Sequence, residues 1–283
     1  MSLADGGLCL WAGSVQRLDF DQRIEAAHAG GFDSTSLFPY EVHRARREGI
    51  ADAELRARFE DAGVRVAVID PLARWLPTWS SPGDLPADDP AHGDLGPDEV
   101  FAMAVAFGAD LISVLALYDP PVSAELGGPA FAALCDQAAE HGLRLQLEFI
   151  PGTGIHDLTA AWEIVQAADR PNGGILLDTW HFFRSDSSFE LLEELPADRI
   201  FGLQIEDAPA EFPADPAHES LHGRLLPGEG GLDLARFISV VADKVPELTG
   251  PEVFSDELGA LPAGELGRRL GETTRAALDS PRS

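Results

Sequence analysis

The sequence predicts an α/β fold of the (β/α)8 TIM-barrel type, with one barrel accounting for all 283 residues. Three observations support this fold. Short apolar runs recur along the whole chain, a polar segment with helical periodicity follows each run, and glycine usually stands just past that segment. This alternation is typical of parallel sheets built from βα units. Eight such units are present, the number that a TIM barrel requires, whereas a doubly wound sheet usually needs fewer.

The expected strands are apolar or rich in β-branched residues. In chain order they are residues 8–13, 32–38, 64–70, 110–117, 143–149, 174–179, 199–207 and 251–257. The clearest helices between them are residues 21–30, 51–63, 96–108, 128–142 and 157–169. Most of these helices end in or before a glycine, which readily adopts the left-handed conformation that terminates a helix. The repeated order of helix, glycine and strand assigns residues 1–283 to a single barrel domain.

One long segment interrupts this alternation. Residues 71–96 are rich in Pro, Gly and Asp and contain Trp75 and Trp79. Loops of this length in compact domains are usually functional or disordered, and exposed tryptophans are uncommon in disordered segments. We interpret residues 71–96 as a βα loop that partly covers the ligand, with both tryptophans near the substrate. A variable surface loop is the alternative interpretation.

The composition excludes several classes of protein. Asp and Glu number 48 against 20 Lys and Arg, and the formal net charge of −28 repels nucleic acid. Only two cysteines occur, Cys9 and Cys135, so no disulfide framework is expected. Neither a signal peptide nor an apolar run long enough to span a membrane is visible. We therefore expect a cytoplasmic protein with a small-molecule partner.

Oxygen-bearing side chains stand on four consecutive expected strands. Glu148 ends the fifth strand, Asp178 ends the sixth, Gln204 and Asp207 lie on the seventh, and Glu252 lies on the eighth. The carboxyl ends of barrel strands meet at one face, where active sites are built. Carboxylates packed there repel one another unless they are protonated or a cation neutralises them. Because all the donors are oxygens, one hard divalent ion is expected, Mn²⁺ or Mg²⁺ before Zn²⁺ or Co²⁺.

These residues lie in an ordered set of motifs that resembles a known family. The runs "LEF", "LLDTWHFFRS", "GLQIEDA", "RLLPGEGGLDL" and "EVFSDE" occur in this order and span most of the chain. Together they resemble the sugar phosphate isomerase/epimerase family of xylose-isomerase-like TIM barrels. The resemblance implies that one divalent metal is bound by Glu148, Asp178, Gln204 and Glu252. It also implies that His181 of "DTWH" contacts the substrate.

Further residues are expected at the substrate. Arg224 of the "RLLPGEG" run resembles a family residue that contacts the substrate, and pairing with surface acids is its alternative role. Trp180 and Phe149 stand beside expected ligands, so they are expected to form apolar walls for a sugar face, with ordinary core packing as the alternative. His181 is expected to act in catalysis. A residue at a helix start without a catalytic role is the alternative for this histidine.

The chain departs from the family pattern at two places. Gln204 stands where many sugar epimerases have His, and Gln at this place also occurs in related dehydroshikimate dehydratases. Gly250 and Pro251 directly precede Glu252 and interrupt the expected eighth strand, which leaves Glu257 as an alternative ligand.

The expected function is that of a metal-dependent isomerase or epimerase of carbohydrate metabolism, acting on a sugar, a ketose or a ketone derived from a polyol. Glu148 and Glu252 are the catalytic pair, one removing a carbon-bound proton and the other returning it, with the enediolate held by the metal. Loss of a β-hydroxyl would instead make a dehydroshikimate or inosose dehydratase. A non-catalytic sugar-binding barrel is the alternative from a different class. The exact substrate, its phosphorylation and a homodimeric state stay open.

Overall fold

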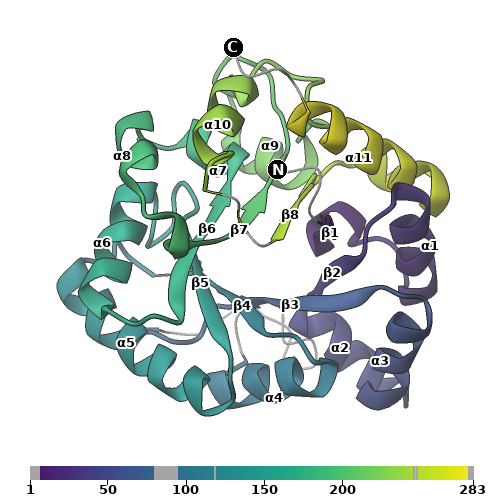
Figure 1. Cartoon of the computed structure of the whole chain (residues 1–283), viewed down its shortest axis with the longest axis horizontal. Helices are drawn as coiled ribbons and strands as arrows, with labels where there is room; N and C mark the ends of the chain where they lie inside the picture. Colours follow the sequence, from purple (N-terminus) through teal and green to yellow (C-terminus); the bar gives the residue numbers. More distant parts are fainter. Residues whose placement is uncertain (1–6, 80–94, 118, 245, 247, 280–283) are drawn as a thin grey trace.

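The computed structural model describes residues 7–79, 95–117, 119–244, 246 and 248–279. Within this part, eight parallel strands form one sheet in the order in which they occur in the chain. Figure 1 shows them around a central axis, with helices in a ring outside. The strands are β1 (Cys9–Leu10), β2 (Ser34–Leu37), β3 (Arg65–Leu72), β4 (Leu111–Val114), β5 (Arg144–Glu148), β6 (Gly173–Asp178), β7 (Ile200–Gln204) and β8 (Leu248–Gly250).

Helices return the chain from the end of one strand to the start of the next. The α-helices are α1 (Phe20–Gly30), α2 (Pro39–Arg47), α3 (Asp52–Asp61), α4 (Pro97–Phe107), α5 (Ala124–Glu140), α6 (Leu158–Ala168), α7 (Thr179–Arg184), α8 (Phe189–Glu194), α9 (Pro216–His222), α10 (Leu234–Val241) and α11 (Ala263–Leu278). Short 3-10 helices are η2 (Ala12–Val15), η3 (Ala197–Arg199) and η4 (Leu258–Ala260). Local sequence sets helix ends. The Asp19 carboxylate accepts the Gln22 N–H at the start of α1, and Gly31 ends this helix at φ 66°.

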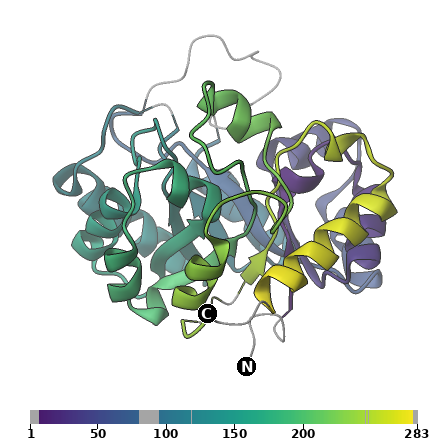
Figure 2. The same ribbon diagram turned by 90° about the horizontal axis from the view of Figure 1, so that it is seen from above.

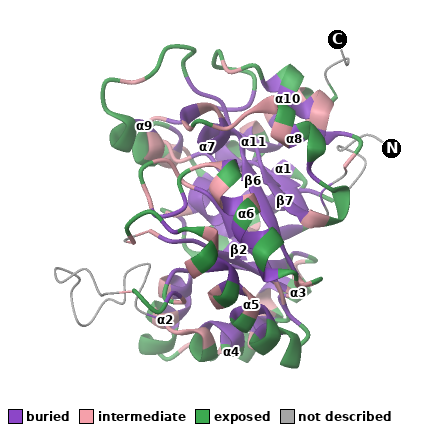
Figure 3. Cartoon of the chain, turned by 90° about the vertical axis from the view of Figure 1, so that its left-hand side faces the viewer, coloured by how far each residue is buried: buried purple, intermediate pink, exposed green. Residues whose placement is uncertain are grey.

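Apolar residues fill two layers of the barrel. The larger layer lies between the strands and the surrounding helices, and Figure 3 shows buried strands with exposed residues mainly on the helices and loops. A smaller cluster contains Trp11, Val68, Leu111, Leu176 and Phe201. Figure 2 shows α1 beside α11, so the first and last helices pack together. The contact is close, because a Cβ on Gly267 would lie 1.9 Å from the carbonyl oxygen of Ala26.

The barrel closes where β8 meets β1. A parallel bridge joins Leu8 to Thr249, and a Cβ at Gly250 would lie 1.7 Å from the carbonyl oxygen of Cys9. The prediction of an eighth strand at 251–257 was wrong. Pro251 has no N–H to donate to a ladder, so the strand ends one residue before it.

The other seven predicted strands and all five predicted helices are confirmed, with shorter or shifted ends. α5 begins at Ala124, four residues before the predicted start, and continues through Pro129. Of the predicted covering loop, residues 80–94 lie outside the described residues. In the part of the chain that is described, no helix has the length and apolar character needed to cross a membrane.

Candidate active site

A cavity of about 800 Å³ lies at the carboxyl ends of the strands, the face on which barrel enzymes carry their active sites. Titratable side chains from strand ends and the loops after them line it, among them Asp70, Glu148, His181, Arg224 and Glu252. Its walls are largely apolar and include Phe38, Leu115, Ile150, Trp180 and Phe254. The cavity therefore combines a group of acidic side chains with surfaces suited to the apolar faces of a ring.

Glu148, Asp178 and His181 form a compact buried group, and Glu148 and His181 line the cavity. One ligand atom from each lies within 4.8 Å of the others. His181 Nε2 is 3.4 Å from Glu148 Oε1 and 3.6 Å from Asp178 Oδ2. The local chain geometry explains this arrangement, because Asp178 both ends β6 and caps α7 by accepting the His181 N–H at 2.7 Å. The cap turns the chain so that His181 lies back over the strand end.

β7 and the residues directly after it contribute two further buried polar side chains. Gln204 pairs in register with Asp178, so both side chains stand on the same side of the sheet. Both amide atoms of Gln204 are buried without a hydrogen-bond partner among the described residues. Glu206 follows two residues later, and its Oε1 accepts the Trp180 N–H at 2.7 Å. The sequence analysis singled out Gln204 but missed Glu206, although a spacing of two residues marks it for the same side.

Glu252 lies two residues past the end of β8 and is nevertheless buried at the cavity. Its Oε1 accepts the N–H of Gly13 at 3.3 Å. Glu257 is exposed just before η4, away from the residues that line the cavity. Glu252 and Glu257 were the alternative ligands after the eighth strand, and of these two only Glu252 lines the cavity with the other carboxylates.

Arg224 is buried among the acidic groups. Its Nη1 donates to Asp178 Oδ2 at 2.8 Å and to the Glu252 carbonyl at 3.3 Å. Its guanidinium lies 5.2 Å from the Trp180 ring centre and 5.0 Å from that of Phe254. Arg224 therefore balances part of the negative charge and does not pair with surface acids.

Buried carboxylates outnumber the positive charges at this site, and most of their pKa values are raised. Burial, with a smaller contribution from the charge of Asp178, raises the pKa of Glu148 to about 8. Burial also raises the pKa values of Asp70, Glu206 and Glu252 well above their ordinary range. Without a cation, several of these groups would keep a proton at neutral pH.

The pKa values of Asp178 and His181 are lowered, unlike those of the neighbouring carboxylates. Burial alone would raise the pKa of Asp178, but the charges of His181 and Arg224 hold it below its ordinary value. Burial lowers the pKa of His181 to about 4, so the imidazole is neutral at physiological pH. Its Nδ1 has no hydrogen-bond partner among the described residues.

These observations fit a divalent cation. Buried carboxylates gather without enough positive charge, and the unpartnered amide of Gln204 stands in register with Asp178. A cation with oxygen ligands would supply the missing charge and use the free lone pairs. The compact group of Glu148, Asp178 and His181, with the Gln204 amide in register beside Asp178, therefore suits such an ion.

The structure adds residues that the sequence analysis missed. Asp70 lies on β3 and lines the cavity, and its place near a strand end was the available signal. Glu219 on α9 is also buried, and its Oε1 accepts from Trp180 Nε1 at 2.9 Å and from Arg184 Nε at 2.7 Å. Glu219 thus fixes α9 against α7. No local sequence pattern marks this pair of contacts.

Three expected substrate contacts lie elsewhere. Phe149 follows the cavity-facing Glu148 and is fully buried in the apolar core, which corrects its assignment to a substrate wall. Trp75 donates from Nε1 to the Leu115 carbonyl at 2.8 Å and packs against Phe131. Neither Trp75 nor Trp79 is among the described residues that line the cavity.

The carboxylate of Asp207, which the sequence favours as an orienting group and not as a ligand, binds backbone N–H groups. Its carboxylate accepts N–H groups from Ala208, Gly228 and Leu232 at 2.8 to 3.1 Å. These bonds occupy the carboxylate and hold the glycine-rich turn after β7 in place.

The chain is similar to curated enzymes over part of their length. It is 29% identical over 254 residues to a 3-dehydroshikimate dehydratase of Pseudomonas aeruginosa, a match that covers 85% of this chain and 37% of that enzyme. It is 31% identical over 147 residues to an inosose isomerase of Bacillus subtilis, covering 50% of this chain and 51% of that enzyme. The chain thus spans little more than a third of the dehydratase and about half of the isomerase.

Solved structures share the fold over nearly the whole chain. The IolI protein with a bound zinc atom superposes with a TM-score of 0.80 at 19% identity, covering 96% of this chain and 98% of that one. A probable 3-dehydroshikimate dehydratase, AsbF from Bacillus anthracis, gives a TM-score of 0.71 at 16% identity, covering 97% of this chain and 100% of that one. An L-ribulose 3-epimerase gives a TM-score of 0.68 at 14% identity, covering 97% of this chain and 95% of that one. At these identities the likeness concerns the fold alone.

A family model also matches most of the chain. The model described as xylose isomerase-like TIM barrel matches residues 24–277, which include all the cavity carboxylates described above. The eight-stranded parallel barrel agrees with this match. The chain therefore belongs to the xylose isomerase-like TIM barrel family.

Proposed function

We propose that this chain is a divalent-metal-dependent enzyme that transfers a carbon-bound proton next to the carbonyl group of a sugar or polyol-derived ketone. One observation carries the proposal: Glu148, Asp178 and His181 place ligand atoms within 4.8 Å of one another, and Glu148, His181 and Glu252 line the same cavity. Carboxylates in such a setting can accept and return a proton at a carbon whose acidity is raised by a neighbouring carbonyl.

Four side chains would hold the metal: Glu148, Asp178, Gln204 and Glu252. The unpartnered amide of Gln204 and the excess of buried carboxylates support this set. Oxygen ligands favour Mn²⁺ or Mg²⁺, while Zn²⁺ and Co²⁺ are included in the test below. A bound divalent cation would polarise a carbonyl oxygen and stabilise the negative charge that develops there.

Glu148 and Glu252 are the proposed proton-transfer groups. Glu148 ends β5 and Glu252 follows β8, two strands lie between β5 and β8 in the barrel order, and both residues line the cavity. They can therefore reach a ring from different directions. Burial raises the pKa of Glu148 to about 8 in the metal-free chain, and a bound cation would favour its ionised form, which can accept a carbon-bound proton.

Neighbouring residues would orient the substrate. The neutral His181 imidazole lies 3.4 Å from Glu148 and lines the cavity, so it can bond a substrate oxygen close to the proposed base. Arg224 keeps Asp178 ionised and in place through the 2.8 Å bond. Trp180 lines the cavity beside them and would cover an apolar face of the ring.

Loss of water is the outcome that the comparisons favour. The dehydratase match extends over 85% of this chain, against 50% for the inosose isomerase match. The Gln204 position agrees with this preference, because the resemblance described above associates Gln with dehydroshikimate dehydratases. We therefore propose elimination of a β-hydroxyl from a ring ketone of the dehydroshikimate or inosose kind.

Isomerisation or epimerisation is the second candidate. The presence of both Glu148 and Glu252 at the cavity favours it, because return of the proton by a second carboxylate gives a rearranged product without loss of water. The inosose isomerase relatives agree with this candidate.

A substrate screen separates these outcomes. The chain would be stripped with a chelator, reloaded separately with Mn²⁺, Mg²⁺, Co²⁺ or Zn²⁺, and given 3-dehydroshikimate, inososes and ketoses in heavy water. Metal-dependent growth of conjugated-product absorbance would support dehydration, whereas metal-dependent deuterium incorporation without water loss would support isomerisation. Substrate binding with neither metal dependence nor proton exchange would contradict both and indicate a non-catalytic sugar-binding barrel.

A further inference from the structure

Glu252 reaches the cavity from backbone that is not part of the sheet. β8 ends at Gly250, whose carbonyl accepts the Ile205 N–H at 2.9 Å, and Pro251 has no N–H. The sheet ladder therefore does not fix the direction of the Glu252 side chain. A residue proposed to bind metal and move a proton needs another source of rigidity.

Ser14 supplies bonds on both sides of Glu252. Its hydroxyl donates to the Pro251 carbonyl at 2.9 Å and accepts the Val253 N–H at 2.7 Å. Ser14 is itself buried. One hydroxyl thus bridges the residue before and the residue after Glu252, replacing the ladder bonds that end at Gly250.

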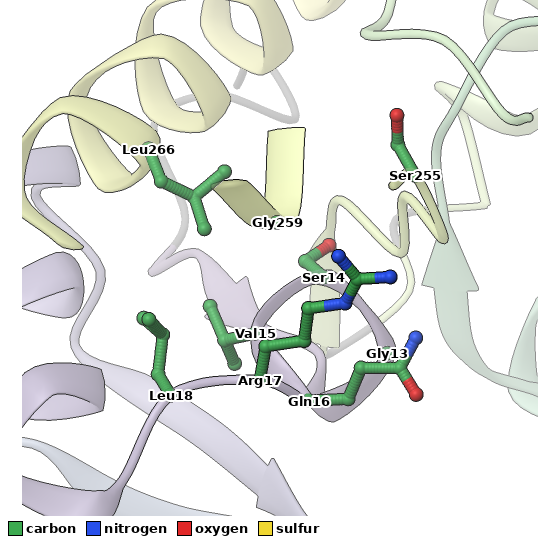
Figure 4. Close-up of a pocket in the computed structure, with 9 residues that line it drawn as sticks. All are labelled: Gly13, Ser14, Val15, Gln16, Arg17, Leu18, Ser255, Gly259 and Leu266. Atoms are coloured by element: carbon green, nitrogen blue, oxygen red, sulfur yellow. The ribbon is translucent and has the colours of Figure 1, made fainter. Parts of the chain in front are cut away.

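Gly13 completes the contact between η2 and Glu252. Its N–H donates to Glu252 Oε1 at 3.3 Å, so η2 contacts the carboxylate as well as the backbone around it. A Cβ on Gly13 would lie 2.9 Å from Glu252 Cγ and 2.4 Å from the Phe254 ring, so no larger side chain fits without displacement. Figure 4 shows Gly13 and Ser14 on η2, with Ser255 and Gly259 from the chain after β8, around one small pocket.

We propose that Ser14 is a positioning residue that holds the Pro251–Val253 backbone so that the Glu252 carboxylate faces the cavity. The inference rests on the proposed function of Glu252 as metal ligand and proton-transfer group. Ser14 does not line the cavity, so it acts through Glu252 and not on the substrate. Groups that orient metal ligands in this way commonly change metal affinity or activity by roughly 10- to 100-fold when they are removed.

Three variants test the role of Ser14. Ser14→Ala removes both bonds, whereas Ser14→Thr keeps the hydroxyl and can place its methyl group towards the pocket of Figure 4. Ser36→Ala is the matched control, because the buried Ser36 hydroxyl accepts the Ala12 N–H at 2.8 Å on the same η2, and among the described residues it makes no hydrogen bond to residues 251–253.

The first readout is hydrogen–deuterium exchange of the Val253 amide in metal-free protein, and the second is affinity for Mn²⁺ alone by calorimetry. We expect Ser14→Ala to speed Val253 exchange, to weaken Mn²⁺ binding by about 10-fold and to lower kcat more than it raises KM. Ser14→Thr should restore the slow Val253 exchange, the Mn²⁺ affinity and kcat. Ser36→Ala should lower the melting temperature while leaving Mn²⁺ affinity near that of the parent.

Parent Mn²⁺ affinity in Ser14→Ala, or equal weakening in Ser36→Ala, would overturn the inference and leave Ser14 as a purely structural residue. If the parent chain binds no divalent metal and turns over none of the screened ketones, the proposed function fails. Unchanged Val253 exchange in Ser14→Ala would then refute the positioning role as well, since that readout requires no metal.

Discussion

Arg224 Nη1 donates a hydrogen bond to Asp178 Oδ2 at 2.8 Å, and both side chains are almost fully buried. The guanidinium also lies near Glu206, with 3.4 Å between Arg224 Nη1 and Glu206 Oε1. A buried ion pair does not guarantee stability, but removal of one partner leaves the other charge without compensation. Arg224 is therefore the protein's own counter-charge for the acidic group.

Replacing Arg224 by Met should destabilise the metal-free protein by about 3 kcal/mol, because Asp178 would be left buried and unpaired. The double variant Arg224→Met, Asp178→Asn should recover part of this loss. Urea denaturation of the parent and both variants measures the effect. A single variant as stable as the parent would show that Arg224 does not compensate this charge.

The proton-transfer role predicts the effect of amide substitutions. Glu148→Gln and Glu252→Gln keep the side-chain length and one oxygen but cannot accept a carbon-bound proton, so each should lower turnover by roughly 10²-fold. Steady-state kinetics at saturating metal, together with substrate exchange in heavy water, provide the measurement. If the variants bind metal and exchange substrate protons at the parent rate, a group other than these two glutamates must be the base.

His181 is proposed to contact the substrate and not the metal. His181→Ala should therefore lower turnover by about 10²-fold while the four oxygen ligands retain the ion. Metal content measured alongside kcat distinguishes the two roles. Loss of the ion from this variant would make His181 a ligand, in agreement with its 3.4 Å distance from Glu148.

The raised pKa of Glu148 predicts how stability depends on pH. Between its ordinary value of 4.5 and about 8, the folded metal-free protein holds a proton that the unfolded chain has lost. The contribution of Glu148 to stability therefore falls as pH rises through this window. Asp178 has a lowered pKa, so its contribution is lost only as pH falls below its ordinary value of 3.8.

Melting temperatures of chelator-treated protein from pH 5 to 8 measure this dependence. The melting temperature should fall more steeply with rising pH in the parent than in Glu148→Gln, which has no titrating group at this position. Saturating metal should remove much of the difference, because ligation favours the ionised carboxylate. Parallel profiles for the parent and the variant without metal would be inconsistent with a raised Glu148 pKa.

The sequence was most informative where local rules decide the structure. Apolar runs followed by helix and glycine located the strands, and Glu148 and Asp178 were found because parallel strands expose their last residues at one face. The error at Phe149 was avoidable. Side chains alternate along a strand, so a residue directly after the cavity-facing Glu148 points into the layer beneath the helices.

Other features depend on contacts between distant parts of the chain. The bonds from Ser14 to the Glu252 segment join residues more than 230 positions apart, and Glu219 reaches Trp180 and Arg184 from another helix. The close approach of Gly250 to the Cys9 carbonyl also joins distant parts of the chain. No periodicity or local motif encodes such contacts, so they became visible only in the folded chain.

Metal stoichiometry tests the central claim most directly. The parent and the double variant Glu148→Gln, Asp178→Asn would be saturated with Mn²⁺, dialysed against metal-free buffer and subjected to elemental analysis. We expect one divalent ion per parent chain and strongly substoichiometric metal in the double variant, whose circular dichroism should match the parent. A parent chain that retains no ion, or a double variant that retains as much as the parent, would contradict the proposed metal centre.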